Sequence, residues 1–268
     1  MNGQTGYATI TAAVSSAGVL DQARVAHFQQ HGWVHVPGFF DAQEVRELQS
    51  WTDELAARPQ LPGADMVYLE QNLLDPGSRV VQRIEYFCRS HAGFDVLLNR
   101  GRLSLAASQL LDEPVCLFKE KINFKYSGGG GFEPHQDQQA GWSAYAPIFL
   151  SVLVGIDQAT VENGCLEIAV DQPARLRTLI GEEWKPLQDG PALRYQAVPT
   201  APGDAIFFDS YVPHRSNPNL TASPRRILYA SYNAQSHGEH REQYFRHKRA
   251  NFPPDCEREA GRVYEFKV

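Results

Sequence analysis

Two residues of metal-ligand type stand two positions apart in the stretch FEPHQD, His135 and Asp137. In an extended segment, residues i and i+2 project to the same face, so this pair would offer one nitrogen and one oxygen to a common point. His214 follows the stretch GDAIFFDSYVP far along the chain and could supply a second imidazole. Two imidazoles and one carboxylate on one face of a metal leave three coordination positions open. That arrangement is typical of non-haem Fe(II) oxygenases, which use the open positions for O₂ and a bidentate co-substrate.

A hydroxyl and a cation follow the second histidine. Ser216 lies two residues beyond His214, and Arg225 lies where the next predicted strand begins. Arginine presents a planar fork that binds a carboxylate through two hydrogen bonds. The HxD pair by itself is weak evidence, because a surface turn with a solvated acid gives the same pattern. The combined pattern of HxD, H-x-S and Arg is much more specific, and it predicts an iron site beside a carboxylate-binding cation.

The elements that position these residues divide the chain into a helical part and a β-rich part. Residues 21–31 predict a helix capped by Asp21, and Asp41 is predicted to cap a second helix. Residues 92–111 predict further, mostly helical structure. From about residue 114 onward, short β-rich runs alternate with Gly, Pro and Asn, as is typical of a β-sandwich or barrel. We therefore expect an α+β, mainly β fold in which helices pack on a β core.

Composition excludes several classes of protein. The chain has 268 residues, of which 43% are hydrophobic and 21% charged, as in an average globular protein. A net charge of −6 disfavours a general nucleic-acid binder. No apolar run approaches the roughly 18 residues of a membrane span, so we expect no membrane partner. We expect residues 1–20 to form a flexible arm and residues 21–268 to form a single domain.

The number and spacing of the cysteines indicate the redox environment of the protein. The four cysteines form no CxxC pair, which disfavours a zinc knuckle or a thioredoxin motif. Scattered cysteines of this kind are typical of small core residues in a reducing compartment. The first twenty residues also lack the basic region of a signal peptide. We therefore expect a cytoplasmic protein, while the sequence does not indicate its oligomeric state.

The stretches that contain these residues resemble the phytanoyl-CoA dioxygenase superfamily of Fe(II)/2-oxoglutarate oxygenases. The resemblance covers roughly residues 22–254 and is most specific in residues 118–137 and 203–233. The runs FKEKINFKYSGGGGFEPHQD and GDAIFFDSYVPHRSNPN resemble most closely the branch that includes 2-aminoethylphosphonate dioxygenases. The resemblance implies a double-stranded β-helix, the jelly roll of cupin-like proteins, with helices backing one sheet.

The resemblance also implies roles for individual residues. It implies three iron ligands, which are His135, Asp137 and His214. Arg225, helped by Ser216, would bind the distal carboxylate of 2-oxoglutarate, and Asn123 would contact its carboxylate near the metal. Strand alternation would point Arg226 away from that site.

Several residues are candidates for substrate binding. Four polar residues alternate along one predicted strand and share a face, namely Lys119, Lys121, Asn123 and Lys125. The first two could hold an anionic substrate or could be solvated strand charges. Trp142 resembles an aromatic residue that lines the pocket in related hydroxylases, although a packed core tryptophan would give the same pattern. The candidates for contact with substrate are Lys119, Lys121, Gln138 and Trp142.

Together these features predict a dioxygenase that uses Fe(II), 2-oxoglutarate and O₂. It would hydroxylate an unactivated C–H bond of a small polar metabolite, with an anionic one as an option, and release succinate and CO₂. The substrate is either a phosphonate or an intermediate of natural-product biosynthesis, which would be hydroxylated or oxidatively cyclised. Two other classes remain as alternatives, a cupin-type isomerase or hydrolase that does not use 2-oxoglutarate and a non-catalytic metal-binding jelly-roll protein. Arg225 and Ser216 argue against the first, and the intact ligand set argues against the second.

Overall fold

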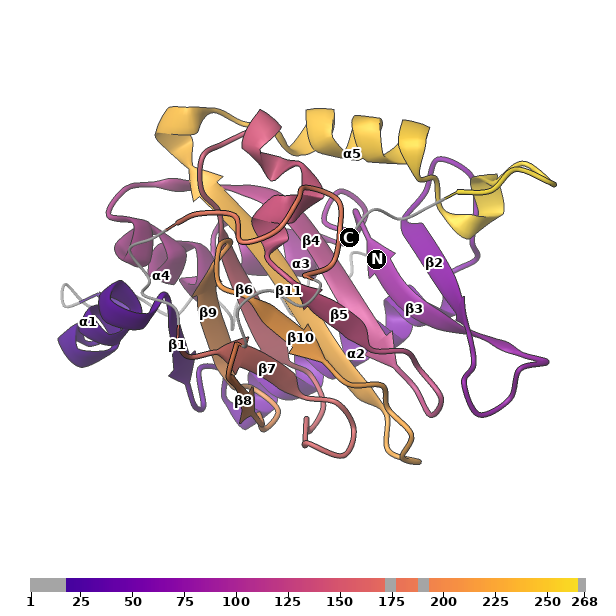
Figure 1. Ribbon diagram of the computed structural model, residues 1–268, viewed down its shortest axis with the longest axis horizontal. Helices are drawn as coiled ribbons and strands as arrows, with labels where there is room; N and C mark the ends of the chain where they lie inside the picture. Colours follow the sequence, from indigo (N-terminus) through magenta and orange to yellow (C-terminus); the bar gives the residue numbers. More distant parts are fainter. Residues whose placement is uncertain (1–17, 172–176, 188–192, 265–268) are drawn as a thin grey trace, which may run out of the picture.

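The computed structural model describes residues 18–171, 177–187 and 193–264, in which two antiparallel sheets face each other (Figure 1). The larger sheet has seven strands, in the order β1 (Trp33–Val36), β9 (Ala205–Asp209), β6 (Leu150–Gly155), β11 (Arg225–Ala234), β4 (Val115–Lys125), β3 (Arg79–Glu85) and β2 (Met66–Gln71). The smaller sheet has four, in the order β5 (Phe132–His135), β10 (His214–Ser216), β7 (Leu166–Ala169) and β8 (Tyr195–Val198). The predicted β core is therefore confirmed as a pair of antiparallel sheets.

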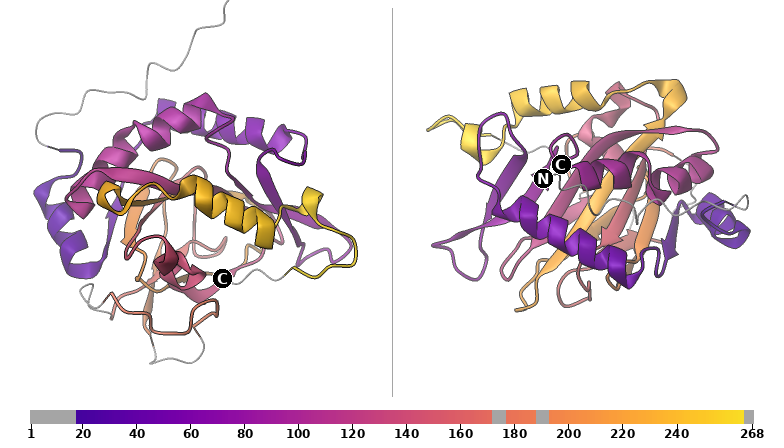
Figure 2. Two further views of the ribbon diagram at one scale, coloured as in Figure 1. Left: turned by 90° about the horizontal axis from the view of Figure 1, so that it is seen from above. Right: turned by 180° about the vertical axis from the view of Figure 1, so that it is seen from behind.

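Helices cover the outer face of the larger sheet, as expected for helices backing one sheet (Figure 2). They are α2 (Ala42–Ala57), α3 (Ala92–Asn99) and α4 (Arg102–Leu111). Their apolar faces pack on strand residues such as Ile122, Val152 and Leu228, which form one large buried cluster with them. α1 (Gln22–His31) packs beside β1 at the edge of the same sheet.

Local capping signals determine where the first two helices begin. The Asp21 carboxylate accepts a hydrogen bond from the backbone N–H of Arg24 at the start of α1. Asp41 caps α2 and forms a reciprocal capping box with Glu44. The stretch 92–111 forms two helices, because the chain turns at Gly101, where any Cβ would meet the Leu97 carbonyl oxygen at 2.4 Å.

Alternation along the strands separates the helix-facing core from the space between the sheets. On β11, Leu228 packs with the helices, whereas Ile227 belongs to the apolar cluster that joins the two sheets. On β6, Val152 and Leu153 divide in the same way. On β4, Lys119, Lys121 and Asn123 fall on the inner face and line the cavity between the sheets, as the strand period requires.

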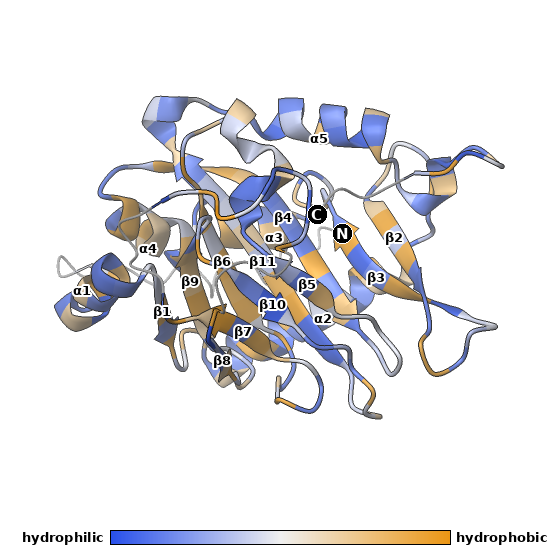
Figure 3. Cartoon of the chain, in the orientation of Figure 1, coloured by the Kyte–Doolittle hydropathy of each residue, from blue (hydrophilic) through white to orange (hydrophobic). Residues whose placement is uncertain are grey.

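A third apolar cluster lies where α5 (Arg241–Asn251) crosses one end of the sheets. Most of α5 is hydrophilic (Figure 3), but Tyr244 and Phe245 are buried against Phe118 and Trp142. The charged sequence of α5 therefore forms a helix with one buried face, which includes Tyr244, Phe245 and Lys248.

The predicted N-terminal arm lies largely outside the described residues, which start at residue 18. Leu20 is buried, and its backbone N–H donates to the Gln109 side chain. Among the described helices, none has the length and apolar character needed to cross a lipid bilayer.

Candidate active site

The three predicted metal ligands converge at one end of the smaller sheet. His135 ends β5 and pairs directly with His214, the first residue of β10. Asp137 begins the short 3₁₀ helix η1 (Asp137–Ala140) immediately after β5. One ligand atom from each of the three side chains lies within 4.8 Å of the others. The HxD spacing and the distant histidine therefore form one cluster suited to a single metal ion.

Backbone carbonyls orient both imidazoles. His135 Nδ1 lies 2.7 Å from the Glu133 carbonyl oxygen, and His214 Nδ1 lies 3.0 Å from that of Val212. A ring whose Nδ1–H donates to a carbonyl keeps the Nε2 lone pair for a metal. The Ser151 hydroxyl on β6 donates to Asp137 Oδ2 at 2.5 Å, which leaves the other carboxylate oxygen for coordination.

The protonation states of these three side chains also suit the binding of a divalent cation. Burial and the neighbouring His214 lower the pKa of His135 to about 3, and burial lowers the pKa of His214 as well. Burial raises the pKa of Asp137, but the two histidines and Lys121 outweigh it and hold the pKa below its usual value. Two neutral imidazoles and one ionised carboxylate are the forms that bind metal, so the donor set fits Fe(II).

Arg225 at the start of β11 is a buried cation that pairs with no carboxylate among the described residues. It is fully buried, and none of its three side-chain nitrogens has a hydrogen-bond partner of ordinary geometry among the described residues. Arg226, the next residue, turns to the other face and pairs with Asp157 and Asp53. Because an uncompensated buried charge is costly, Arg225 requires an anion, and the distal carboxylate of 2-oxoglutarate fits that requirement.

Lys125 lies directly opposite Arg225 across the β4–β11 ladder. Its Nζ donates to Ser216 Oγ at 2.9 Å and to the Asn217 carbonyl. When Lys125 carries its extra proton it can only donate, so the Ser216 oxygen then accepts and the Ser216 proton stays available for a ligand. Gly164 makes room for this contact, because a Cβ there would lie 2.1 Å from the Asn217 carbonyl oxygen. The alternation of β4 places Lys125 on this face but does not reveal its partner.

One cavity brings most of the predicted residues together. Its lining includes Lys119, Lys121, Asn123, His135, Asp137, Trp142, His214 and Ser216. The Asn123 side-chain oxygen is buried without a hydrogen-bond partner in the described structure, as expected of a group that awaits a ligand. Tyr229, four residues beyond the fully buried Arg225 on β11, also lines this cavity.

Gln138 is a correction to the predicted set. Its side-chain amide donates to Ser143 Oγ and to the Ala146 carbonyl, each at 3.1 Å, and its oxygen accepts from Ser210 Oγ at 2.8 Å. The residue is fully buried and is absent from the linings of the described cavities beside the triad. Because η1 turns after Asp137, the side chain points into the loop that follows and does not line the cavity at the triad.

Comparison with known proteins agrees with this geometry. The sequence pattern of the phytanoyl-CoA dioxygenase (PhyH) family matches residues 28–227. The chain belongs to this family. Its relatives include the 2-aminoethylphosphonate dioxygenase of the uncultured bacterium HF130_AEPn_1, which is 36% identical and matches over 91% of this chain and 93% of the relative. The methylphosphonate hydroxylase of Gimesia maris is 37% identical over 87% of this chain and 88% of that protein.

Solved structures show the same fold. The EctD protein of S. alaskensis, solved with 2-oxoglutarate and 5-hydroxyectoine, superposes with a TM-score of 0.69 at 24% identity, over 85% of this chain and 81% of that one. Its iron-bound form gives a TM-score of 0.68 at 25% identity, over 85% and 82% of the two chains. Family membership and the His-Asp-His cluster confirm the predicted class. This PhyH-family protein is a dioxygenase that uses Fe(II), 2-oxoglutarate and O₂.

Proposed function

We propose that this PhyH-family enzyme hydroxylates a C–H bond of a small phosphonate, with conversion of 2-oxoglutarate to succinate and CO₂. The observation that carries the proposal is the pair Lys119 and Lys121, whose side chains line the cavity beside the metal ligands. Neither lysine forms an ion pair with a carboxylate in the part of the chain that the structure describes. Anionic ligands in this cavity, the substrate among them, would supply the missing charge. The two phosphonate-oxidising relatives support a phosphonate in particular.

Different residues of the chain would bind the metal and the co-substrate. His135, Asp137 and His214 would hold Fe(II), which when bound supplies the activation of O₂. Arg225 would bind the distal carboxylate of 2-oxoglutarate, with the Ser216 hydroxyl as a second donor. A fixed co-substrate leaves the remaining side of the cavity for the substrate.

Other side chains of the cavity would keep water from the reacting groups. Phe132, Leu166 and Phe208 line it on the sides contributed by β5, β7 and β9. Asn123 would contact the 2-oxoglutarate carboxylate nearest the metal, because its buried side-chain oxygen has no partner among the described residues and the amide can turn its NH₂ group toward an acceptor. A dry, preorganised site strengthens each of these polar contacts.

The same proposal extends to architecture and location. The two facing antiparallel sheets would form a double-stranded β-helix, and residues 21–268 would form one domain. All four cysteines are free thiols, which is typical of a reducing compartment, so we place the enzyme in the cytoplasm.

Spectroscopy under anaerobic conditions tests the proposal first. Addition of Fe(II) and then 2-oxoglutarate should produce a weak visible charge-transfer band. Methylphosphonate or 2-aminoethylphosphonate should then shift the band and, once O₂ is admitted, stimulate succinate release. Acetate and proline serve as non-phosphonate comparisons. A band that only non-phosphonates shift would refute the phosphonate assignment, and iron binding without a band would favour an enzyme that does not use 2-oxoglutarate.

A further inference from the structure

We propose that Lys119 and the indole N–H of Trp142 form the subsite that binds the phosphonate oxygens of the substrate, whereas Lys121 serves the co-substrate side of the cavity. The inference rests on the proposed function and deepens it. It assigns different ligands to two lysines that stand two residues apart on the same face of β4.

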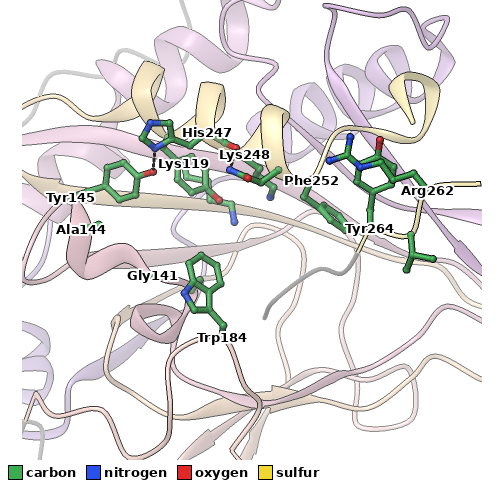
Figure 4. Close-up of a pocket in the computed structure, with 14 residues that line it drawn as sticks. Lys119, Gly141, Ala144, Tyr145, Trp184, His247, Lys248, Phe252, Arg262 and Tyr264 are labelled. Atoms are coloured by element: carbon green, nitrogen blue, oxygen red, sulfur yellow. Dashed lines mark hydrogen bonds between the residues drawn. The ribbon is translucent and has the colours of Figure 1, made fainter. Parts of the chain in front are cut away.

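Lys119 lines three neighbouring cavities on the side of the metal ligands. It lines the cavity at the triad, the cavity that leads from it toward Tyr68, and a cavity of about 690 Å³ beneath α5. Figure 4 shows this last cavity, with Lys119 and α5 on one side and Trp184 on the other. The side chain of Lys119 is only 7% exposed, so its charge lies in a largely dry setting. A substrate that enters through either larger space would meet this ammonium group beside the metal.

Trp142 supplies a second donor that lacks an acceptor. Its indole nitrogen is buried and has no hydrogen-bond partner among the described residues, although a buried indole N–H usually finds one. Phe118 and Phe149 hold the ring edge-on, with centroids 5.3 and 5.0 Å away. The Lys119 ammonium nitrogen lies 5.6 Å from the centroid of the same ring. An oxyanion with several oxygens could therefore accept from both groups at once.

The nearby carboxylate does not satisfy Lys119. Glu85 is fully buried, and its two oxygens accept from Arg83 Nε at 2.7 Å and from Lys248 Nζ at 2.5 Å. The charge of Lys119 also acts on Glu85. The Glu85 carboxylate therefore has three positively charged neighbours, Arg83, Lys248 and Lys119. The surplus positive charge favours a doubly charged anion such as a phosphonate.

Lys121 has different surroundings. Its ammonium nitrogen lies 5.4 Å from the Phe132 ring centroid and 5.0 Å from that of Tyr229. It lines the triad cavity, as do Ser216 and Asn123, and it shares the cavity toward Tyr68 with Lys119, but it does not line the large cavity beneath α5. Phe132 and Tyr229 therefore place Lys121 on the side where 2-oxoglutarate would bind, and Trp142 places Lys119 on the other.

Single substitutions separate the two assignments. Trp142→Phe removes the N–H and keeps an aromatic ring, and Lys119→Met removes the charge at similar length. With Fe(II) and 2-oxoglutarate bound in the absence of O₂, both should weaken methylphosphonate binding at least about tenfold, the loss typical of a charge-assisted hydrogen bond. The dissociation constant of 2-oxoglutarate should change less than about twofold. Lys121→Met should show the reverse pattern.

Controls and a direct probe keep the test decisive. Trp33→Phe and Lys185→Met, both outside the cavities, should bind the two ligands as the native enzyme does, and Lys119→Arg should retain most phosphonate affinity. If Trp142→Phe does not fold, the indole N–H resonance of Trp142 in native protein loaded with Zn(II) should shift when methylphosphonate is added.

The possible failures are distinguishable. If the native enzyme binds iron and 2-oxoglutarate but neither phosphonate, the proposed function is wrong. If it binds methylphosphonate and the affinity is unchanged in Lys119→Met, or the Trp142 N–H does not respond, the subsite is wrong while the function stands. If Lys121→Met weakens the phosphonate and not 2-oxoglutarate, the division between the lysines is wrong.

Discussion

His214 lies directly opposite His135 where β10 pairs with β5, and the centroids of the two rings are 4.3 Å apart. The backbone pairing of a sheet, rather than a mobile loop, thus sets the distance between the two nitrogen ligands. Asp137 joins them because η1 starts two residues after His135. A site built on paired strands holds its geometry more precisely than one built on loops.

Ser151→Ala should weaken Fe(II) binding about 10–100-fold without loss of the fold. The Ser151 hydroxyl is the donor that fixes Asp137 Oδ2, and its removal leaves that carboxylate free to rotate. Anaerobic Fe(II) titration measures the effect, with Asp137→Ala as the variant that should lose specific binding altogether. Native iron affinity in Ser151→Ala would show that the hydrogen bond does not orient the ligand.

Arg225→Met should raise the dissociation constant of 2-oxoglutarate at least about tenfold, because a charge-assisted contact to the carboxylate is lost. Arg226→Met is the matched control on the opposite face of the strand. It should leave 2-oxoglutarate binding unchanged but lower the free energy of unfolding by about 1–3 kcal/mol, since Asp157 loses its partner. The charge-transfer band and thermal denaturation report the two quantities. The reverse result would move the co-substrate site to Arg226.

Binding of 2-oxoglutarate should take up a proton at Lys125. Burial and the charge of Arg225 lower the pKa of Lys125 from 10.5 to about 6. Between these two pH values, the Lys125 side chain of the free enzyme is therefore mostly the neutral amine. A bound carboxylate favours the ammonium form and raises the pKa again, so the proton returns on binding. Calorimetry at about pH 8 in buffers of different ionisation enthalpy should show this uptake.

Lys125→Met is the control for the proton uptake and should abolish it. The same variant should weaken 2-oxoglutarate binding, because Ser216 loses the donor that orients its hydroxyl. Equal heats in every buffer for the native enzyme would contradict the shifted pKa of Lys125.

Gln138→Leu should lower the free energy of unfolding by about 1–3 kcal/mol, because it leaves the Ala146 carbonyl and two serine hydroxyls without their partner. The affinity of the folded variant for methylphosphonate should stay within about twofold of native, since the side chain faces the loop. Denaturant unfolding and ligand titration measure the two effects. A selective loss of phosphonate affinity would return Gln138 to the substrate site.

The sequence alone determined the features that depend on local geometry. The HxD spacing put His135 and Asp137 together, and strand alternation separated Arg225 from Arg226. The caps at Asp21 and Asp41 began their helices where expected, because a cap needs only its own first turn.

Tertiary structure decided what depends on contacts between distant segments. The hydrogen bond from Lys125 to Ser216 requires the two sheets to face each other with β4 near β10. The different surroundings of Lys119 and Lys121 come from α5, β5 and β11. Gln138 lies in η1, and its side-chain amide is held by the Ala146 carbonyl and by the hydroxyls of Ser143 and the distant Ser210, contacts that no strand pattern predicts. Periodicity within one element predicts which residues share a face, but it contains no information about which other element that face will meet.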